Sequence, residues 1–344
     1  MSADWPAVAG EPQASAVLRS QPEDFRVDEE LGFAPEGEGE HVFLRLQKRC
    51  LNTADLAQRL SSLSGIHPRD IAFSGMKDRN AVTRQWFSVR MAGREEPDWQ
   101  QLEASGDVQV MAVARHRRKL KRGVHRSNRF TLVLRELNGD RVELEQRLSR
   151  LAEQGAPNYF GPQRFGREGR NLEQAKRWML GSAGRLSRQK RGLLLSVLRA
   201  QLFNSLLADR VVRGDWHRVL VGDTCVLHGT RSQFFCDRPD EDIEERCRSG
   251  DLHPALPLWG RGLEARNDAI CLRWRAVLAA QVEICAFLAQ QGMECGWRPA
   301  RLIPDDFCWD FCDDGSLQLE FRLGAGCYAT ALLAELVRYT ELQA

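Results

Sequence analysis

An aspartate surrounded by cations, in residues 74–87, is the best candidate in the chain for a catalytic group. Asp78 is flanked by Lys77 and Arg79, and Arg84 follows a few residues later. Cations within about 4–6 Å of a carboxylate hold it ionised, and an ionised, positioned carboxylate can act as a nucleophile. From spacing alone the favoured interpretation is a surface turn that Asp78 caps and that local ion pairs stabilise, because aspartates in loops are usually turn formers.

Two runs of basic residues could hold a chain of phosphates. Residues 115–129 contain eight arginines and lysines and no acid, and residues 164–199 contain ten against two glutamates. The formal net charge is only +2, because acids gather elsewhere, as in residues 237–251. A solvated surface is the alternative interpretation of each run. Two long runs in a nearly neutral chain nevertheless favour a nucleic-acid backbone as partner.

Several other kinds of protein are disfavoured. None of the ten cysteines has CxxC spacing or lies near a histidine pair with ligand spacing, so we expect free thiols in a reducing cytoplasm and no metal. The chain shows no signal peptide and no run of about 18 apolar residues, so we expect no membrane span. It also lacks a P-loop and a dinucleotide fingerprint, and we therefore expect no cofactor.

Local patterns around Asp78 predict the elements that must position it. A strand, a helix and a second strand follow one another, and Asp78 lies on the loop before the second strand, where Gly75 would allow a tight turn. Asn52 or Thr53 can cap the helix. The predicted strands span residues 41–48, 85–91, 108–113 and 130–134, and the predicted helix spans residues 52–63.

The rest of the chain predicts a helical middle between two parts of one sheet. Residues 317–323 alternate as a strand, and a single strand cannot stand alone. We therefore expect this strand to return to the first sheet, which makes the middle of the chain an insertion. Residues 1–14 are expected to form a loose leader. The predicted helices span residues 142–154 (stopped by Gly155), 193–211 and 276–290, and a final helix carries Leu332, Leu333, Leu336 and Val337.

Five segments, in the same order along the chain, resemble the signature blocks of the TruD family of pseudouridine synthases. Residues 75–86, GMKDRNAVTRQW, match the family pattern GxKDxxAVTxQW. The other blocks are PEDFRVDE at residues 22–29, NRF at 128–130, PNYFGPQRFG at 157–166 and LGAGCYAT at 323–330. In the last block Gly324 and Cys327 replace the usual proline and serine. The resemblance runs from about residue 17 to the end of the chain.

The resemblance implies an α+β fold. A pseudouridine-synthase-like, mixed and mainly antiparallel sheet flanked by helices would carry an inserted α/β TRUD domain. We therefore expect a discontinuous catalytic domain, residues 1–154 and 302–344, and an inserted domain, residues 155–301, that grips RNA. The family's nucleophilic aspartate falls on Asp78. Arg19, which precedes the PEDF block, and Lys77 are the two competing cations that could pair with it.

The resemblance also implies roles in uridine binding. Phe130 would be the flat platform on which the base stacks, and the amide of Asn128 would bind the uracil edge or a phosphate. Phe25 and Tyr328 match family positions that line the uridine pocket. From the residues alone, the three aromatic side chains could equally be core residues and Asn128 a turn residue.

The function implied is that of a tRNA pseudouridine synthase, an isomerase that acts on uridine 13 of the D arm, with glutamate tRNA as the usual substrate. We expect a tRNA as partner, no cofactor, no metal and no membrane, and a monomer in the cytoplasm. Three routes stay open, since Asp78 could attack C1′, attack C6 or remove a proton to make a glycal. The alternatives are a non-catalytic RNA-binding protein or RNA chaperone, and a metal-dependent nuclease.

Overall fold

The computed structural model describes residues 5–182, 184–230, 232–263 and 266–341. The chain folds into two compact units, each built from segments that are distant in sequence. The helical unit comprises Met1–Gln13, Arg141–Ile303 and Cys327–Val337. The sheet unit comprises Ala14–Asp140, Pro304–Gly326 and Arg338–Ala344.

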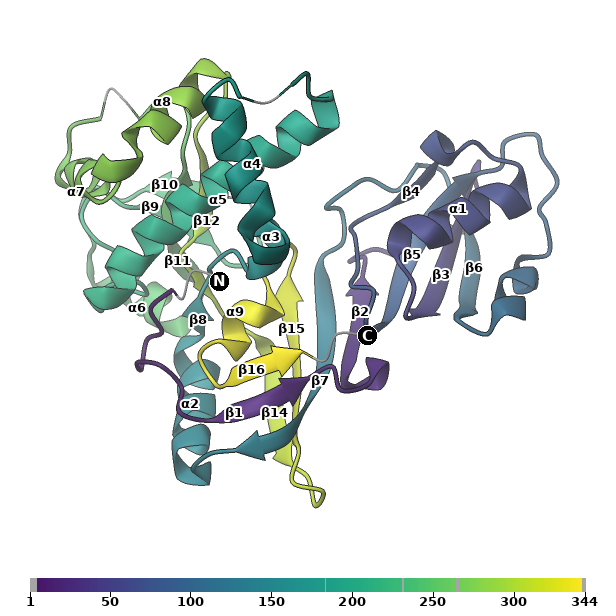
Figure 1. Cartoon of the computed structure of the whole chain (residues 1–344), viewed down its shortest axis with the longest axis horizontal. Coiled ribbons are helices and arrows are strands. Elements are labelled where there is room, and N and C mark those ends of the chain that lie inside the picture. Colours follow the sequence, from purple (N-terminus) through teal and green to yellow (C-terminus); the bar gives the residue numbers. More distant parts are fainter. Residues whose placement is uncertain (1–4, 183, 231, 264–265, 342–344) are drawn as a thin grey trace. The chain divides into compact units, whose positions relative to one another are not determined.

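A ten-stranded sheet forms the core of the sheet unit (Figure 1). It is mainly antiparallel, as expected, and its parallel pairs within the described residues are β2 with β5 and β1 with β16. Along the main path the order is β14 (Asp305–Phe311), β15 (Leu317–Gly324), β7 (Ser127–Asn138), β2 (Phe25–Glu30), β5 (Val82–Arg90), β3 (His41–Arg49) and β6 (Val108–His116). Beside this path, β1 (Ser15–Leu18) pairs with β7 and with β16 (Arg338–Glu341), and β4 (Ile71–Phe73) pairs with β5.

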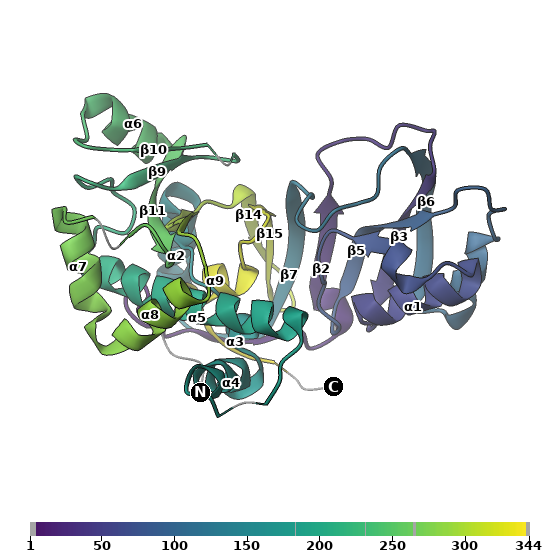
Figure 2. The same ribbon diagram turned by 90° about the horizontal axis from the view of Figure 1, so that it is seen from above.

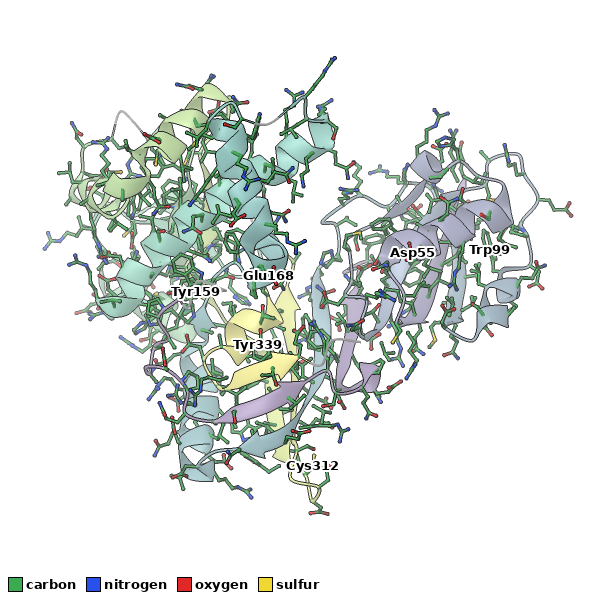
Figure 3. All side chains as sticks on the ribbon, viewed as in Figure 1. Asp55, Trp99, Tyr159, Glu168, Cys312 and Tyr339 are labelled. Atoms are coloured by element: carbon green, nitrogen blue, oxygen red, sulfur yellow. The ribbon has the colours of Figure 1, made fainter. Side chains whose placement is uncertain are left out.

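Helix α1 (Thr53–Ser64) covers the β3–β5 part of the sheet (Figure 1). Its Leu56 and Leu60 are fully buried, in a cluster that also holds Phe87 and Trp99; Trp99 is labelled in Figure 3. The helix begins after Asn52, as predicted, but neither candidate cap binds the first-turn amides: the Asn52 amide donates to Asp55 instead. Short 3-10 helices lie at Pro22–Asp24 (η1), Pro68–Asp70 (η2) and Trp99–Ser105 (η3).

The last alternating segment returns to the sheet, as predicted. Strand β15 pairs with β7 from Leu317 opposite Leu134 to Gly324 opposite Ser127. The pattern missed β14, an edge strand whose alternate residues are exposed. The predicted final helix is wrong in its length: α9 ends at Leu333, and the chain turns into β16 because that strand pairs in parallel with β1. Leu336 and Val337 are buried without being helical.

The helical unit is built around α5 (Arg188–Val212), which contacts α4, α7, α8 and β11 (Figure 2). The helix predicted over residues 276–290 is broken, because Leu278 leaves the helical conformation. No helix within the described ranges is long and apolar enough to cross a bilayer. The other helices are α2 (Arg141–Gln154), α3 (Pro162–Phe165), η4 (Arg167–Gly169), α4 (Arg170–Met179), α6 (Glu241–Ser249), α7 (Ala269–Val277), η5 (Ala279–Gln281), α8 (Val282–Gln290) and α9 (Ala329–Leu333). Its strands are β10 (Gln233–Phe235), β9 (Thr224–Leu227), β11 (Leu252–Leu258) and β12 (Gly296–Pro299) in one sheet, with β8 (Ala156–Pro157) and β13 (Arg301–Leu302) paired apart.

The expectation of a loose leader is wrong from Trp5 onward, where the described chain begins. Trp5 stacks on Tyr159, whose hydroxyl donates to the Pro6 carbonyl at 3.2 Å (Figure 3 labels Tyr159). The buried Arg147 donates to the main-chain carbonyls of three leader residues, which side-chain composition does not reveal. These are Ala9, Gly10 and Glu11.

The compact units and the domains expected from the sequence are divided at different residues. Helix α2 and residues 327–337 pack with the helical unit, although the sequence placed both in the catalytic domain. Arg147 of α2 explains part of this, because it also donates to the carbonyl of Glu335 at 3.0 Å. The functional division, with catalysis in residues 1–154 and 302–344 and RNA gripping in 155–301, stays a prediction.

Candidate active site

The loop that carries Asp78 lies between β4 and β5, and α1 and β5 fix its backbone. The Lys77 amide donates to the Thr53 hydroxyl at 3.0 Å, and that hydroxyl donates to Gln85 at 2.9 Å. The Gln85 amide in turn donates to the carbonyl of Gly75 at 3.2 Å. Because Thr53 and Gln85 are both fully buried, this chain of hydrogen bonds holds the loop in one place.

Gly75 does not play the part that its position predicted. It does not adopt a positive φ. A Cβ at this position would meet the His125 ring at 3.8 Å and Lys77 Nζ at 3.9 Å, which are ordinary contacts. A tight turn is therefore not what requires glycine here.

The carboxylate of Asp78 is held by Arg19, one of the two predicted cations. Arg19 Nη2 donates to Asp78 Oδ2 at 2.7 Å, and its Nη1 donates to Glu341 Oε1 at 2.7 Å. The Arg19 guanidinium lies 4.0 Å from the centre of the Phe25 ring. Asp78 keeps 46% of its side chain exposed, whereas Arg19 keeps 13%. The carboxylate is thus oriented by one cation and still open to a substrate.

The backbone of Arg19 is strained. Its φ is 61°, in the left-handed region that non-glycine residues seldom occupy. Such outliers cost on the order of 1–3 kcal/mol and persist where surrounding contacts hold them, which is most often at functional sites. The two ion pairs and the Phe25 ring supply those contacts.

Lys77, the competing cation, has a different partner. Its Nζ lies 2.7 Å from Glu29 Oε2, and the side chains are 6% and 0% exposed. Glu29 also accepts a hydrogen bond from the Trp86 amide at 3.1 Å. Burial, and secondarily the charge of Lys77, lower the pKa of the neighbouring His125. Through Glu29, Lys77 therefore anchors the loop to β2 and β5.

Three of the predicted uridine-binding residues lie on one face of β2 and β7. The Phe25 and Phe130 rings meet edge to face, with centroids 6.2 Å apart. Phe130 is only 8% exposed, and Phe321 stacks on it at 5.3 Å. Asn128 stands two residues before Phe130 on β7, so both side chains project from the same face. A stacking role for Phe130 must therefore use the part of the ring that Phe321 and Phe25 leave open.

Some buried polar atoms without a partner belong to the Asp78 loop, to Arg19 and to the strands beside them. Leaving such an atom unpaired costs about 1–3 kcal/mol, so each one calls for an explanation, and a bound ligand is one. Asn128 belongs to the motif strand, Arg19 binds Asp78, and Ser74 begins the loop itself. Within the described part of the sheet unit, the buried polar side-chain atoms without a partner are Arg19 Nε, Ser20 Oγ, His41 Nδ1, Arg45 Nε, Ser74 Oγ, Thr83 Oγ1, His125 Nδ1, Asn128 Oδ1 and Arg322 Nε.

Lys48 was missed by the sequence analysis. Its side chain is 0% exposed, and its Nζ donates to the main-chain carbonyl of Asp78 at 2.7 Å. Burial lowers the pKa of Lys48 to about 8, although the charge of Asp78 opposes that change. A signal was present: Val42, Leu44 and Leu46 alternate toward the core, and Lys48 is the next residue in that series. A lysine at a buried strand position needs a buried partner.

Tyr328 belongs to the helical unit, where it closes a cluster of the PNYFGPQRFG block. Its hydroxyl accepts hydrogen bonds from Arg164 at 2.7 and 3.1 Å, and its ring lies 6.0 Å from Phe160. Arg298, buried among the same aromatic rings, lies 4.1 Å from the centre of Phe160. Two motifs that are far apart in sequence therefore meet in this unit. A place for Tyr328 in the same site as Asp78 stays a prediction.

The two basic runs are only partly neutralised by acids. In the first run Arg115 pairs with Glu96 and Arg129 with Glu30. Its exposed members without an acidic partner in the described chain are Arg118, Lys119, Lys121, Arg122 and Arg126, and Lys119 donates to the main-chain carbonyl of Arg69. In the second run Arg164 and Arg199 make internal hydrogen bonds. The side chain of Arg167 lies outside the described part. Exposed cations of this run, again without an acidic partner among the described residues, are Lys176, Arg177, Arg185, Arg188 and Arg191.

Comparisons with known proteins agree with one another. The family model described as tRNA pseudouridine synthase D (TruD) matches residues 7–182 and 169–336. A tRNA pseudouridine synthase D from Methylococcus capsulatus is 45% identical over 98% of this chain and 95% of its own length, and one from Proteus mirabilis is 42% identical over 97% and 95%. The fold is similar to that of a Methanosarcina mazei protein assigned to tRNA pseudouridine synthase D, with a TM-score of 0.68 at 18% identity, over 97% of this chain and 94% of that one.

Proposed function

This chain belongs to the tRNA pseudouridine synthase D family, and we propose that it converts uridine 13 in the D arm of a tRNA to pseudouridine, with Asp78 as the nucleophile. In this isomerisation the N1–C1′ bond breaks, the base turns, and a C5–C1′ bond forms. The proton lost from C5 is balanced by the one gained at N1. No oxidant, reductant or energy source is consumed, and the chemistry needs only a nucleophile, a base platform and a dry pocket.

The observation that carries the proposal is the combination of exposure and contacts of the Asp78 carboxylate. It is 46% exposed, and it is bound by a mostly buried arginine that itself rests on an aromatic ring. A surface turn would not require an arginine with a left-handed backbone and an aromatic support. Because the Arg19 guanidinium orients this carboxylate and leaves it open to a substrate, Asp78 can attack C1′ or C6 or remove a proton.

The neighbouring residues suit the remaining roles. We assign the flipped uracil to the open part of Phe130, with Phe25 at its edge. The unpaired Oδ1 of Asn128 can accept from the N3–H of uracil, which would complete its hydrogen bonding. By resemblance to the family, Tyr328 is also proposed to line the uridine pocket. Flipping the uridine costs a few kcal/mol, which contacts between phosphates and the exposed cations of the basic runs can offset.

We place the enzyme in the cytoplasm as a monomer. Its ten cysteines are all free thiols, which suits a reducing compartment. Unmodified tRNA is available there as substrate.

The deciding experiment uses unmodified tRNA transcripts, glutamate tRNA among them, incubated with the whole protein in excess chelator. Pseudouridine is then mapped along each transcript. We expect one modified site, at position 13. Modification at another position would overturn the positional proposal while leaving the family chemistry intact.

The same incubation separates the alternatives. A non-catalytic RNA-binding protein or RNA chaperone would bind the transcript and leave every uridine unchanged. A metal-dependent nuclease would cut the transcript only when the chelator is left out. Either outcome would overturn the assignment of Asp78 as the nucleophile of an isomerase.

A further inference from the structure

Lys48 ends a row of side chains that crosses the sheet beneath the loop of Asp78. Register places Lys48 opposite Thr83, Thr83 beside Val27, and Val27 opposite Phe130. Strands β3, β5, β2 and β7 therefore bring a lysine and the proposed base platform onto the same face. All four side chains of the row are buried, and Lys48, at 0% exposure, is its only charged member.

The position is a costly one for an ammonium group. Burial disfavours the charged form of a lysine, and a buried charge is tolerated where it is paired. Lys48 contacts no carboxylate directly: among the described residues, its hydrogen-bond acceptor is the main-chain carbonyl of Asp78. A methionine or leucine would fill the same space at lower cost if the lysine served packing alone.

Asp78 is consequently held at both ends. Arg19 Nη2 binds its carboxylate at 2.7 Å, and Lys48 Nζ binds its carbonyl at 2.7 Å. The two cations come from different parts of the chain and do not share an acceptor. Fixing the main chain limits the rotation of the Asp78 peptide, which would otherwise swing the carboxylate away from its target.

We propose that Lys48 is a positioning residue for catalysis, whose ammonium group fixes the main chain of Asp78 so that the carboxylate is aligned with the reacting uridine. This rests on the proposed function. Displacement of a reacting group by about 1 Å can cost roughly a hundredfold in rate. Lys48 therefore acts on turnover and not on tRNA binding, because the exposed cations that would hold phosphates lie elsewhere.

If Lys48 served only to stabilise the fold, replacing it would lower the free energy of unfolding. The pKa of Lys48 leads to a different expectation. Because burial lowers the pKa of Lys48 to about 8 from an ordinary value of 10.5, the folded chain binds its proton less tightly than the unfolded chain. Between these two values, stability rises with pH as the folded state sheds a proton that the unfolded state keeps. At pH 7 the charged lysine thus opposes folding, and removing the charge should not destabilise the protein.

The test compares Lys48→Met, Lys48→Arg and the parent protein, with Arg59→Met as the control. Arg59 lies on α1 in the same unit and pairs with Asp107 at 2.6 Å. Its replacement therefore removes a cation whose ionic partner lies outside the Asp78 loop. Pseudouridine formation, tRNA binding and thermal unfolding are measured for each. We expect Lys48→Met to lower kcat at least tenfold, to keep its tRNA affinity within twofold, and to melt no lower than the parent.

Each outcome decides. If the parent makes pseudouridine and Lys48→Met keeps its kcat within twofold, Lys48 is not a positioning residue, although the proposed function stands. If the parent makes none on any tRNA, the proposed function fails and the role of Lys48 with it.

If Lys48→Met does not fold, the dependence of kcat on pH tests the proposal instead. The parent's kcat should fall above pH about 8, and Lys48→Arg, which stays charged, should lack that limb. A flat parental profile from pH 7 to 9 would overturn the proposal.

Discussion

Arg19 binds Asp78 with one amino group of its guanidinium and Glu341 with the other, both at 2.7 Å. Glu341 belongs to β16, and Arg19 follows β1 directly, so the parallel pairing of β1 with β16 brings the two ion pairs together. Tyr339 of β16 (Figure 3) shares this environment: burial, and then the charge of Glu341, raise its pKa to about 12. The alignment of the candidate nucleophile thus depends on a strand close to the end of the sequence.

Replacing Asp78 by asparagine should abolish pseudouridine formation and spare tRNA binding. The amide keeps the shape of the side chain but is a poor nucleophile, and the exposed cations that would hold phosphates are untouched. Turnover and filter binding check this. Asp55→Asn is the matched control, because Asp55 is an exposed residue of α1 that accepts a hydrogen bond from Asn52. Near-normal turnover of the Asp78 variant would remove the aspartate from the mechanism.

Replacing Arg19 should reduce turnover without abolishing it. A hydrogen bond to a charged group contributes about 1.5–3 kcal/mol, so Arg19→Met should lower kcat by roughly tenfold to a hundredfold. Arg19→Lys should recover part of that loss, because it keeps the charge but can no longer bind two carboxylates in a planar fork.

Glu341→Gln serves as the companion variant. It removes the competing carboxylate while leaving the bond between Arg19 and Asp78 in place, so kcat should change by less than about threefold. A loss as large as that of Arg19→Met would mean that Glu341, and not Asp78, is the important partner of Arg19. Single-turnover rates on one tRNA transcript measure all three variants.

Much of the frame could be predicted from the sequence because the signals are local. Alternation placed β5 and the return of β15 to the sheet, and apolar spacing placed α1. The TruD-like blocks singled out Asp78 and Arg19, and the structure brings these two residues into contact although 59 positions separate them in sequence.

What could not be predicted depends on partners distant in sequence. Leu336 and Val337 are apolar and fit a helix. The chain instead forms a strand after them, because β16 pairs with an edge of β1 that would otherwise be unpaired. The side chains of the leader give no sign that Arg147 will bind its main-chain carbonyls. Lys48 was overlooked for a similar reason: its partner is a main-chain carbonyl, an acceptor that every residue has.

Binding of tRNA should weaken steeply with salt. Each phosphate contact contributes about −0.7 to −0.9 to the slope of log K against log salt. Replacing Arg118, Lys121 and Arg122 together by glutamine should make the slope shallower by roughly two, because all three are exposed and have no acidic partner within the described residues. Arg59→Gln, which breaks an ion pair with Asp107, is the control. An unchanged slope in the triple variant would mean that this run is only a solvated surface.

The stability of the helical unit should depend on the protonation of Glu335. This carboxyl is 7% exposed, and burial raises its pKa to about 7 from an ordinary value of 4.5. It accepts a hydrogen bond from the Val8 amide at 2.9 Å, while Arg147 and Arg150 lower its pKa only in part. Between about pH 4.5 and 7 the folded chain therefore holds a proton that the unfolded chain has lost. Its contribution to stability is complete below pH 4.5 and declines as the pH rises through 7.

Glu335→Gln should remove this decline, because glutamine stays neutral and can still accept from Val8. A shift of this size corresponds to a few kcal/mol, on the order of 1.4 kcal/mol per unit of pKa. Parent and variant should therefore unfold at similar temperatures at pH 5, and the variant should be the more stable at pH 8. At pH 8, hydrogen exchange at the Val8 amide should also be slower in the variant than in the parent, because docking of the leader uses the same hydrogen bond. Glu153→Gln, an exposed change on α2, should follow the parent at both pH values. Parallel curves for the parent and Glu335→Gln would show that Glu335 is ionised in the folded chain throughout this range, and that burial does not govern its titration.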